Sequence, residues 1–180
     1  MKSNIYFIGF MGTGKSTISK HMADITGYEE IDTDHEIVRQ ESMRIPEIFE
    51  KYGEEYFRNL ETQFLQKMQK RKHCIVSCGG GMVLRKENVA LMKENGVIVL
   101  LTAAPETVLE RVKNGKERPI LNGHMNAAYI EELMEARRKY YEAAGEIVIV
   151  TDGREAGDMA KELKKNLESP KFCFDFSKEV

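Results

Sequence analysis

The sequence has few cysteines, and they do not form the pattern of a disulfide framework. Cys74, Cys78 and Cys173 are an odd and sparse set in 180 residues. Cys74 and Cys78 belong to an apolar stretch with no histidine or cysteine at the spacing of metal ligands. We therefore expect buried thiols in a reducing compartment.

The sequence also lacks a strong net charge and long apolar runs. A formal net charge of -2 gives no broad field for wrapping nucleic acid, so any anion site must be local. No apolar run approaches the length of a membrane span, and residues 1–4 lead into a strand pattern without a cleavable signal. We expect a cytoplasmic protein that binds neither nucleic acid nor membranes.

The chain does contain a regular alternation of short apolar runs and longer helical patterns. With 180 residues and 42% hydrophobic content it fits one globular domain. Continuous β-branched runs separated by helices indicate a mainly parallel sheet covered on both faces, an α/β fold of three αβα layers with five central strands. The strand-like runs are residues 5–8, about 31, 74–78, 97–101 and 147–150.

A phosphate-binding motif follows the first of these runs. Gly9, Gly14, Lys15 and Ser16 satisfy the spacing G-x-x-x-x-G-K-[S/T], between a strand pattern and a helix from Gly14 to about Thr26. Backbone N–H groups of such a loop surround a polyphosphate, the lysine contacts its terminal phosphates and the hydroxyl is a ligand of Mg²⁺. The predicted nucleotide-binding residues are Gly12, Thr13, Gly14, Lys15, Ser16 and Thr17.

Two aspartates and three glycines fall at the ends of later strands. If strand geometry continues, the carboxylates of Asp32 and Asp34 point to the same side, toward the phosphates. One carboxylate then suits the metal and the other an acceptor hydroxyl. Asp34 also fits the N-cap of a helix over residues 35–41. The triple glycine, residues 79–81, is either a flexible turn or a close backbone approach to a ligand.

With these features in this order, the chain resembles the shikimate kinase family over roughly residues 3–165. Residues 45–49 with 53–61 resemble the substrate-binding segment of that family, residues 117–121 resemble its lid, and Arg137 with Tyr141 resembles its second substrate arginine. The resemblance implies a P-loop fold of the nucleoside-monophosphate-kinase type. It also implies transfer of the γ-phosphate of ATP to the 3-hydroxyl of shikimate, in aromatic amino-acid biosynthesis.

The resemblance also implies a role for each matching residue. Shikimate would be held by Asp34, Arg58, Gly80 and Arg137, with Gly79 and Gly81 supporting the turn. ATP and Mg²⁺ would be bound by Lys15, Ser16 and Asp32. Arg118 would close over the transferring phosphate, with Arg111 and Arg154 beside the nucleotide. Asp34, Lys15 and Arg118 are thus the implied catalytic residues. One departure is Lys139, which stands where members of this family usually carry a proline.

Simpler interpretations of the arginines remain open from the residues alone. Arg58 and Glu61 are three apart on one helix and can form an ion pair, whereas an arginine held in this way also suits a carboxylate. Arg137 could simply be one of a run of solvated basic residues, and Arg118 could be a solvated side chain in a polar loop. Two guanidinium groups beside Asp34 would fix a small hydroxylated acid.

We expect residues 1–168 to form one kinase domain that acts as a monomer, with a substrate-binding segment at about 33–61 and a mobile lid at about 112–125. In the tail, residues 169–180, three phenylalanines alternate as in a short docked strand, or the tail is loose. Competing functions are another small-acceptor kinase, such as a gluconate kinase, and a non-catalytic nucleotide-binding regulatory module.

Overall fold

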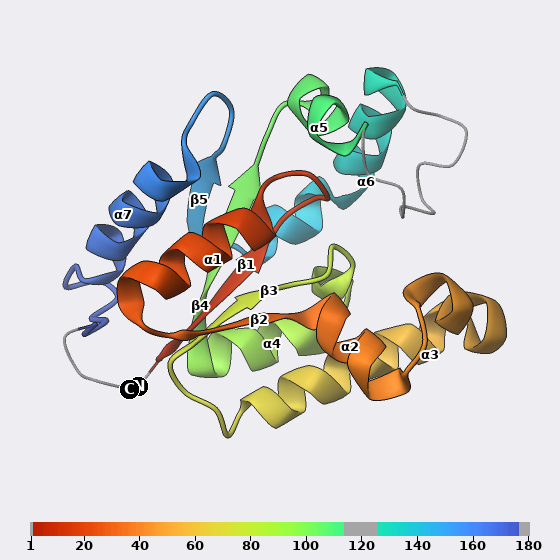
Figure 1. The fold of residues 1–180 in the computed structure, drawn as a ribbon, viewed down its shortest axis with the longest axis horizontal. Helices are drawn as coiled ribbons and strands as arrows, with labels where there is room; N and C mark the ends of the chain where they lie inside the picture. The colour runs from red at the N-terminus through yellow and green to blue at the C-terminus, as the bar shows by residue number, and fades with distance from the viewer. Residues whose placement is uncertain (1, 114–125, 177–180) are drawn as a thin grey trace.

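A computed structural model describes residues 2–113 and 126–176 of the chain, and it has the three layers that the sequence predicts (Figure 1). The central strands are β1 (Asn4–Ile8), β2 (Glu29–Asp32), β3 (Cys74–Ser77), β4 (Gly96–Thr102) and β5 (Ile147–Val150). They form one five-stranded sheet in the order β2-β3-β1-β4-β5, and each neighbouring pair is parallel. The expected mainly parallel sheet is thus wholly parallel within the described residues.

Helices connect the strands and cover both faces of the sheet. They are α1 (Lys15–Thr26), α2 (Thr33–Glu41), α3 (Ile45–Met68), α4 (Lys86–Asn95), α5 (Pro105–Val112), α6 (Ala127–Ala144) and α7 (Ala156–Leu167), with a 3₁₀ turn, η1 (Met82–Leu84). Within α3 the backbone leaves helical geometry at Gly53, whose φ of 80° suits glycine. No helix among the described residues is both long and apolar enough to cross a membrane.

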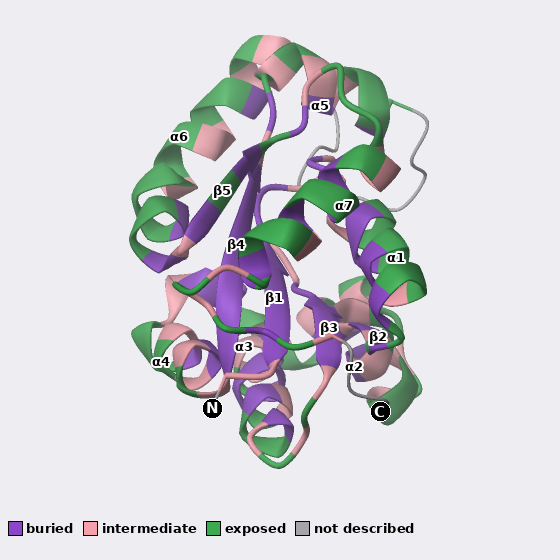
Figure 2. Ribbon diagram, turned by 90° about the vertical axis from the view of Figure 1, so that its left-hand side faces the viewer, coloured by how far each residue is buried: buried purple, intermediate pink, exposed green. Residues whose placement is uncertain are grey.

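Two apolar cores lie on opposite faces of the sheet, because successive strand residues point to opposite sides. Ile5 and Phe7 of β1 pack in one core with residues of α1 and α7. Tyr6 and Ile8 pack in the other core with residues of α3, α4, α5 and α6. Figure 2 shows the buried strands between these two layers of helices. Burial on both faces explains why the central strands are continuous apolar runs.

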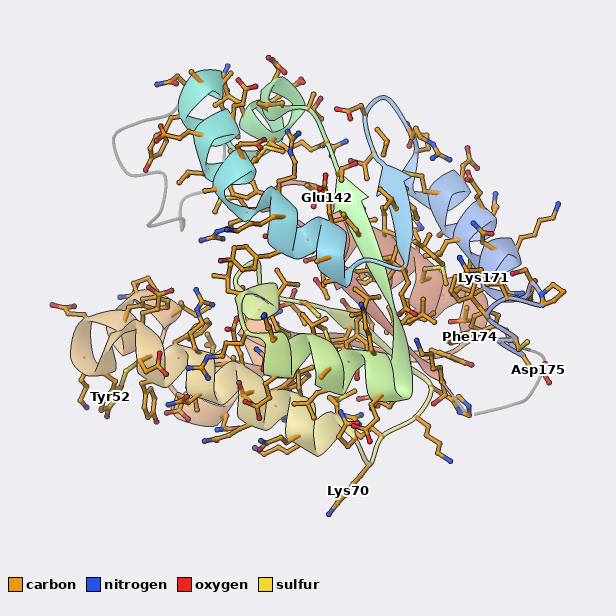
Figure 3. All side chains as sticks on the ribbon, turned by 180° about the vertical axis from the view of Figure 1, so that it is seen from behind. Tyr52, Lys70, Glu142, Lys171, Phe174 and Asp175 are labelled. Atoms are coloured by element: carbon orange, nitrogen blue, oxygen red, sulfur yellow. The ribbon has the colours of Figure 1, made fainter. Side chains whose placement is uncertain are left out.

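The tail after α7 packs against the core as far as it is described. Phe174 is buried in the core that also contains α1 and α7, and its N–H donates to the carbonyl oxygen of Leu167 at 3.0 Å (Figure 3). Residues 169–176 form turns and no strand, so the prediction of a docked strand is wrong. Because Phe174 is buried, the prediction of a loose tail is wrong for this residue. Residues 177–180 lie outside the described residues. The division of the chain at residue 168 stays a prediction.

The three cysteines are free, and two of them are buried as expected. Cys74 and Cys78 lie within the core on β3 and directly after it, whereas Cys173 in the tail is exposed. Burial raises the pKa of the Cys78 thiol far above its ordinary value. Cys78 therefore behaves as a small apolar side chain beneath the glycine turn.

Candidate active site

The phosphate-binding loop, residues 9–14, joins the end of β1 to the start of α1 (Figure 1). A Cβ on Gly9 would lie 2.4 Å from the carbonyl oxygen of Leu101, so only glycine fits beside β4 here. The Lys15 ammonium lies back over the loop and donates to the carbonyl oxygens of Gly9 at 2.8 Å and Phe10 at 3.0 Å. Gly12, Thr13 and Gly14 are in the loop itself. The loop thus ends at the N-terminus of α1, where the positive end of the helix dipole favours an anion.

Two oxygen ligands suited to magnesium lie at the start of α1 and the end of β2. The Ser16 hydroxyl donates to Oδ2 of Asp32 at 3.2 Å, and its oxygen lies 3.3 Å from the Ser77 hydroxyl. Hydroxyl and carboxylate oxygens are the hard ligands that Mg²⁺ prefers. Within residues 2–113 and 126–176 no group of three or more histidine, cysteine or acidic side chains could hold a metal ion. An ion here would therefore take further ligands from phosphate and water. Thr17, also in the first turn of α1, is exposed.

The acidic pair is close to the loop, although not by the geometry that the sequence suggests. Strand β2 ends at Asp32, and Asp34 lies in the first turn of α2. The expectation that both carboxylates project from one strand is therefore wrong. Asp34 as N-cap is wrong as well, because Oδ1 of Asp32 accepts from the backbone N–H groups of Asp34 at 3.1 Å and His35 at 3.2 Å. Since Asp32 caps the helix, the side chain of Asp34 is available for another role.

The triple glycine is the point at which three candidate side chains meet. A Cβ on Gly79 would lie 2.6 Å from Oδ1 of Asp34, and one on Gly81 would lie 2.1 Å from Nη1 of Arg58. None of the three glycines has a positive φ, so glycine provides space here rather than an unusual backbone conformation. The close backbone approach that the sequence left open is therefore present, and it brings α2 and α3 to the end of β3.

Arg137 reaches the same turn from α6. A Cβ on Gly80 would lie 3.7 Å from Nη1 of Arg137 and 3.9 Å from the carbonyl oxygen of Gly9 in the phosphate-binding loop. Arg137 is half-buried, whereas the next two residues, Arg138 and Lys139, are exposed. Helix α6 continues through Lys139 without interruption. Arg137 is therefore not merely one of a solvated basic run.

Arg58 and Glu61 form the expected ion pair on α3, and they do so in a buried place. Nη1 of Arg58 donates to Oε2 of Glu61 at 2.8 Å, while Nε and Nη2 donate to Oε1 of Glu54 at 3.2 and 2.9 Å. Glu61 has no exposed side-chain surface, and its other oxygen, Oε1, has no hydrogen-bond partner among the described residues. An acidic oxygen without a partner in a buried site costs free energy.

Burial changes the acidity of both carboxyl groups near the glycine turn. It raises the pKa of Glu61 to about 7, against the opposing effect of the Arg58 charge. It also raises the pKa of Asp34, and the neighbouring Asp32 charge adds to this effect. These perturbed groups in one place are typical of a functional site.

Replacing Glu61 by glutamine is expected to remove a pH dependence of stability. The unfolded chain releases this proton near the ordinary pKa of 4.5 and the folded chain near 7. The stabilising contribution of Glu61 is therefore full below about pH 4.5 and is lost as the pH rises to about 7, a change of about 3 kcal/mol.

Chemical denaturation at pH 5 and pH 8 tests this expectation. The free energy of unfolding of Glu61→Gln, relative to the unchanged protein, should be higher at pH 8 than at pH 5. Glu54→Gln is the matched control, because Glu54 is the more exposed partner of the same arginine. An equal difference at the two pH values would contradict the prediction.

Three further arginines belong to the predicted nucleotide site, and the structure describes two of them, Arg111 and Arg154. Arg111 on α5 donates to the carbonyl oxygen of Gly12 at 3.2 Å and to the hydroxyl and carbonyl oxygens of Thr151 at 2.9 and 3.0 Å. Arg154 follows β5 and pairs with Glu162 on α7. Arg118 falls outside the described residues. The structure thus places Arg111 directly beside the phosphate-binding loop.

Sequence reasoning missed four buried polar residues near the glycine turn, two of which hydrogen-bond to the turn or to the residue after it. Thr33 is fully buried, and its hydroxyl accepts from the N–H of Gly79 at 2.8 Å. Asn88 donates through Nδ2 to the carbonyl oxygen of Met82 at 3.0 Å and accepts through Oδ1 from the Thr62 hydroxyl at 2.8 Å. Ser77, in contact with Ser16, is the fourth. The available signal was a hydroxyl directly before Asp34, at Thr33, and another two residues before the triple glycine, at Ser77.

The sheet is parallel, and a phosphate-binding loop follows its first strand. Two arginines and an aspartate lie beside that loop. This arrangement defines a P-loop kinase for a small acceptor. The family model described as shikimate kinase matches residues 11–168. This chain therefore belongs to the shikimate kinase family, whose members are ATP-dependent transferases.

Individual relatives agree with this assignment. The shikimate kinase of Persephonella marina is 42% identical over 160 residues, which are 89% of this chain and 96% of that protein. The solved shikimate kinase of Acinetobacter baumannii in complex with shikimate is 34% identical, with a TM-score of 0.86 over 93% of each chain. A solved gluconokinase from Sinorhizobium meliloti 1021 has a TM-score of 0.55 at 17% identity over 92% of this chain and 95% of its own, which shows a shared fold alone.

Proposed function

We propose that this chain transfers the γ-phosphoryl group of ATP to the 3-hydroxyl of shikimate, in the synthesis of aromatic amino acids. One observation carries the proposal: the phosphate-binding loop and the acceptor pocket meet at Gly80. A Cβ there would lie 3.9 Å from the Gly9 carbonyl oxygen and 3.7 Å from Nη1 of Arg137. A terminal phosphate on the loop would thus be next to a small acid held at the glycine turn, as direct transfer requires.

The nucleotide side of the site is formed by the loop and the two ends of secondary structure that flank it. The loop N–H groups of residues 12–17 would bind the phosphates, and Lys15 would turn from the loop carbonyls to the terminal phosphates. Ser16 and Asp32 would hold a magnesium ion, which would neutralise negative charge on the phosphates. Arg111 and Arg154 would lie along the nucleotide.

The acceptor side has a grip for a carboxylate and a separate group for a hydroxyl. The guanidinium groups of Arg58 and Arg137 form forks that bind a carboxylate through paired hydrogen bonds. Asp34 would accept a hydrogen bond from the acceptor hydroxyl, orient it toward the phosphate and take its proton. Gly79, Gly80 and Gly81 would leave room for the ring, and the backbone N–H groups of Gly80 and Gly81 would face it.

The lid remains part of the proposal, although residues 114–125 lie outside the described residues and Val112 is the buried last residue of α5. Arg118 would close over the transferring phosphate, and closure of residues 112–125 would exclude water. We further infer that the enzyme acts as a monomer in the cytoplasm without nucleic acid or membrane partners. Support comes from the small net charge and from free thiols in place of disulfides.

A panel of hydroxy acids with ATP and Mg²⁺ tests the function through release of ADP. A shikimate kinase releases ADP rapidly with shikimate and only slowly without an acceptor. A gluconate kinase would respond to gluconate instead, and a regulatory module would hydrolyse nucleotide slowly whichever acid is present. Equal rates with and without shikimate would refute the assignment.

A further inference from the structure

Tyr141 connects the second substrate arginine to the glycine turn. It is 5% exposed on α6, and its hydroxyl donates to the carbonyl oxygen of Gly80 at 2.6 Å. Arg137 lies one helical turn earlier on the same face of α6. A Cβ on Gly80 would lie 3.5 Å from the Tyr141 hydroxyl oxygen and 3.7 Å from Nη1 of Arg137, so both side chains reach the turn at Gly80.

The chemistry of the three groups decides which hydrogen bonds they can form. A guanidinium group only donates, a carbonyl oxygen only accepts, and a phenol has one proton to donate and an oxygen that accepts. Burial raises the pKa of Tyr141, so the phenol keeps its proton. The Tyr141 O–H donates to Gly80, and the Tyr141 oxygen can therefore still accept a hydrogen bond from the guanidinium group of Arg137.

The glycine turn needs such an anchor because it has no side chains of its own to pack. Thr33 of α2 holds the N–H of Gly79, and Asn88 of α4 holds the carbonyl oxygen of Met82. Between them, Gly80 is held by Tyr141 of α6. Three helices thus fix successive parts of one turn, and the middle contact lies beside Arg137.

A hydrogen bond to Tyr141 would also give the Arg137 side chain a fixed direction. Its neighbours Arg138 and Lys139 point to solvent, and a long, flexible side chain loses rotamer entropy when it is held in one position. A buried partner one turn away, fixed to the turn, compensates for part of that cost before the substrate arrives.

We propose that Tyr141 is a positioning residue for the acceptor carboxylate: its hydroxyl fixes the Arg137 guanidinium and the Gly80 carbonyl relative to each other. This inference rests on the proposed function for the identity of the acid. Tyr141 does not touch the transferring phosphate. It acts on the acceptor through Arg137 and Gly80.

Tyr141→Phe tests the proposal because it removes one hydroxyl and keeps the buried ring. The KM and the Kd for shikimate should rise roughly 3- to 10-fold, as expected for the loss of an ordinary hydrogen bond. The KM for ATP should stay within twofold. Tyr140→Phe is the matched control, because Tyr140 is the adjacent tyrosine and is exposed on the same helix. A purely structural role would instead change both KM values together.

Two further measurements separate this proposal from the proposed function. In the Tyr141→Phe background, Arg137→Lys should weaken shikimate binding by a smaller factor than it does alone, since the two residues act together. Hydrogen exchange of the amides of residues 80–84 should accelerate in Tyr141→Phe and not in Tyr140→Phe, and it needs no shikimate. Unchanged shikimate affinity or unchanged exchange in Tyr141→Phe would overturn the positioning role. If the unchanged protein does not phosphorylate shikimate, the proposed function is refuted. If exchange is nevertheless accelerated in Tyr141→Phe, the contact between Tyr141 and the turn is still supported.

Discussion

Replacing Asp34 by asparagine is expected to lower kcat for shikimate phosphorylation by a factor of roughly 10² to 10⁴, the usual contribution of a general base. Asparagine has nearly the same shape and can still orient a hydroxyl, but it cannot accept the proton. Asp34 faces Gly79 at the acceptor pocket, and Asp32 performs the capping role. The loss should therefore appear in kcat, with the KM for ATP within about twofold of its original value.

The fold should tolerate this replacement. Burial and the nearby Asp32 charge raise the pKa of Asp34, so its ionised form is disfavoured in the folded protein. A neutral amide removes that cost, and the melting temperature of Asp34→Asn should equal or exceed that of the unchanged protein. A large loss of activity without a loss of stability would thus be a chemical effect.

The pH profile gives an independent check on Asp34. As the pH falls through its raised pKa, the carboxylate is protonated and can no longer accept the hydroxyl proton, so kcat of the unchanged enzyme should fall on the acid side. This acid limb should be absent from Asp34→Asn. The matched control is Asp24→Asn, on the exposed side of α1. If kcat of Asp34→Asn stays within threefold of the original value, Asp34 is not the base.

Replacing Arg58 by lysine is expected to raise the KM for shikimate about 100-fold and to leave the KM for ATP nearly unchanged. Three of the five N–H groups of Arg58 are taken by Glu54 and Glu61, so within the described structure two remain for a carboxylate. Lysine keeps the charge and loses the fork. The loss of two charge-assisted hydrogen bonds corresponds to about 3 kcal/mol.

Lysine is the informative substitution because alanine would confuse binding with stability. Arg58→Ala leaves the Glu61 carboxyl buried without its partner, which costs roughly 3 to 5 kcal/mol of stability. Arg39→Lys is the matched control: Arg39 forms an ion pair with Glu36 at the same three-residue spacing, but it is exposed on α2. Steady-state kinetics with each substrate varied in turn make the measurement. Equal increases in both KM values would contradict a role specific to the acceptor.

The sequence alone predicted the parts of this molecule that depend on neighbouring residues. Apolar periodicity gave the five strands and the parallel sheet, because central strands buried on both faces are continuous apolar runs. The spacing of Gly9, Gly14, Lys15 and Ser16 gave the phosphate-binding loop. The Arg58–Glu61 pair followed from a three-residue spacing on a helix.

Local reasoning failed where a strand ends and a helix begins. The sequence favoured a catalytic role for Asp34, with an N-cap as the alternative, and strand geometry for both Asp32 and Asp34. Strand β2 instead stops at Asp32, whose carboxylate accepts from two N–H groups of the first turn of α2. The residue at which a helix begins is defined only to within one or two positions by local sequence. Here such a shift decides which carboxylate is available for chemistry.

The sequence by itself determined the sheet, the phosphate-binding loop and the family, because these depend on spacing within short stretches and on similarity along the chain. Only the tertiary structure decided that Asp34, Arg58 and Arg137, from three different helices, meet at one glycine turn. The same is true of the contact between Tyr141 and Gly80, 61 residues apart in the chain. Helical periodicity says which face of a helix is buried, but the distance between two helices is set by how they pack on the sheet.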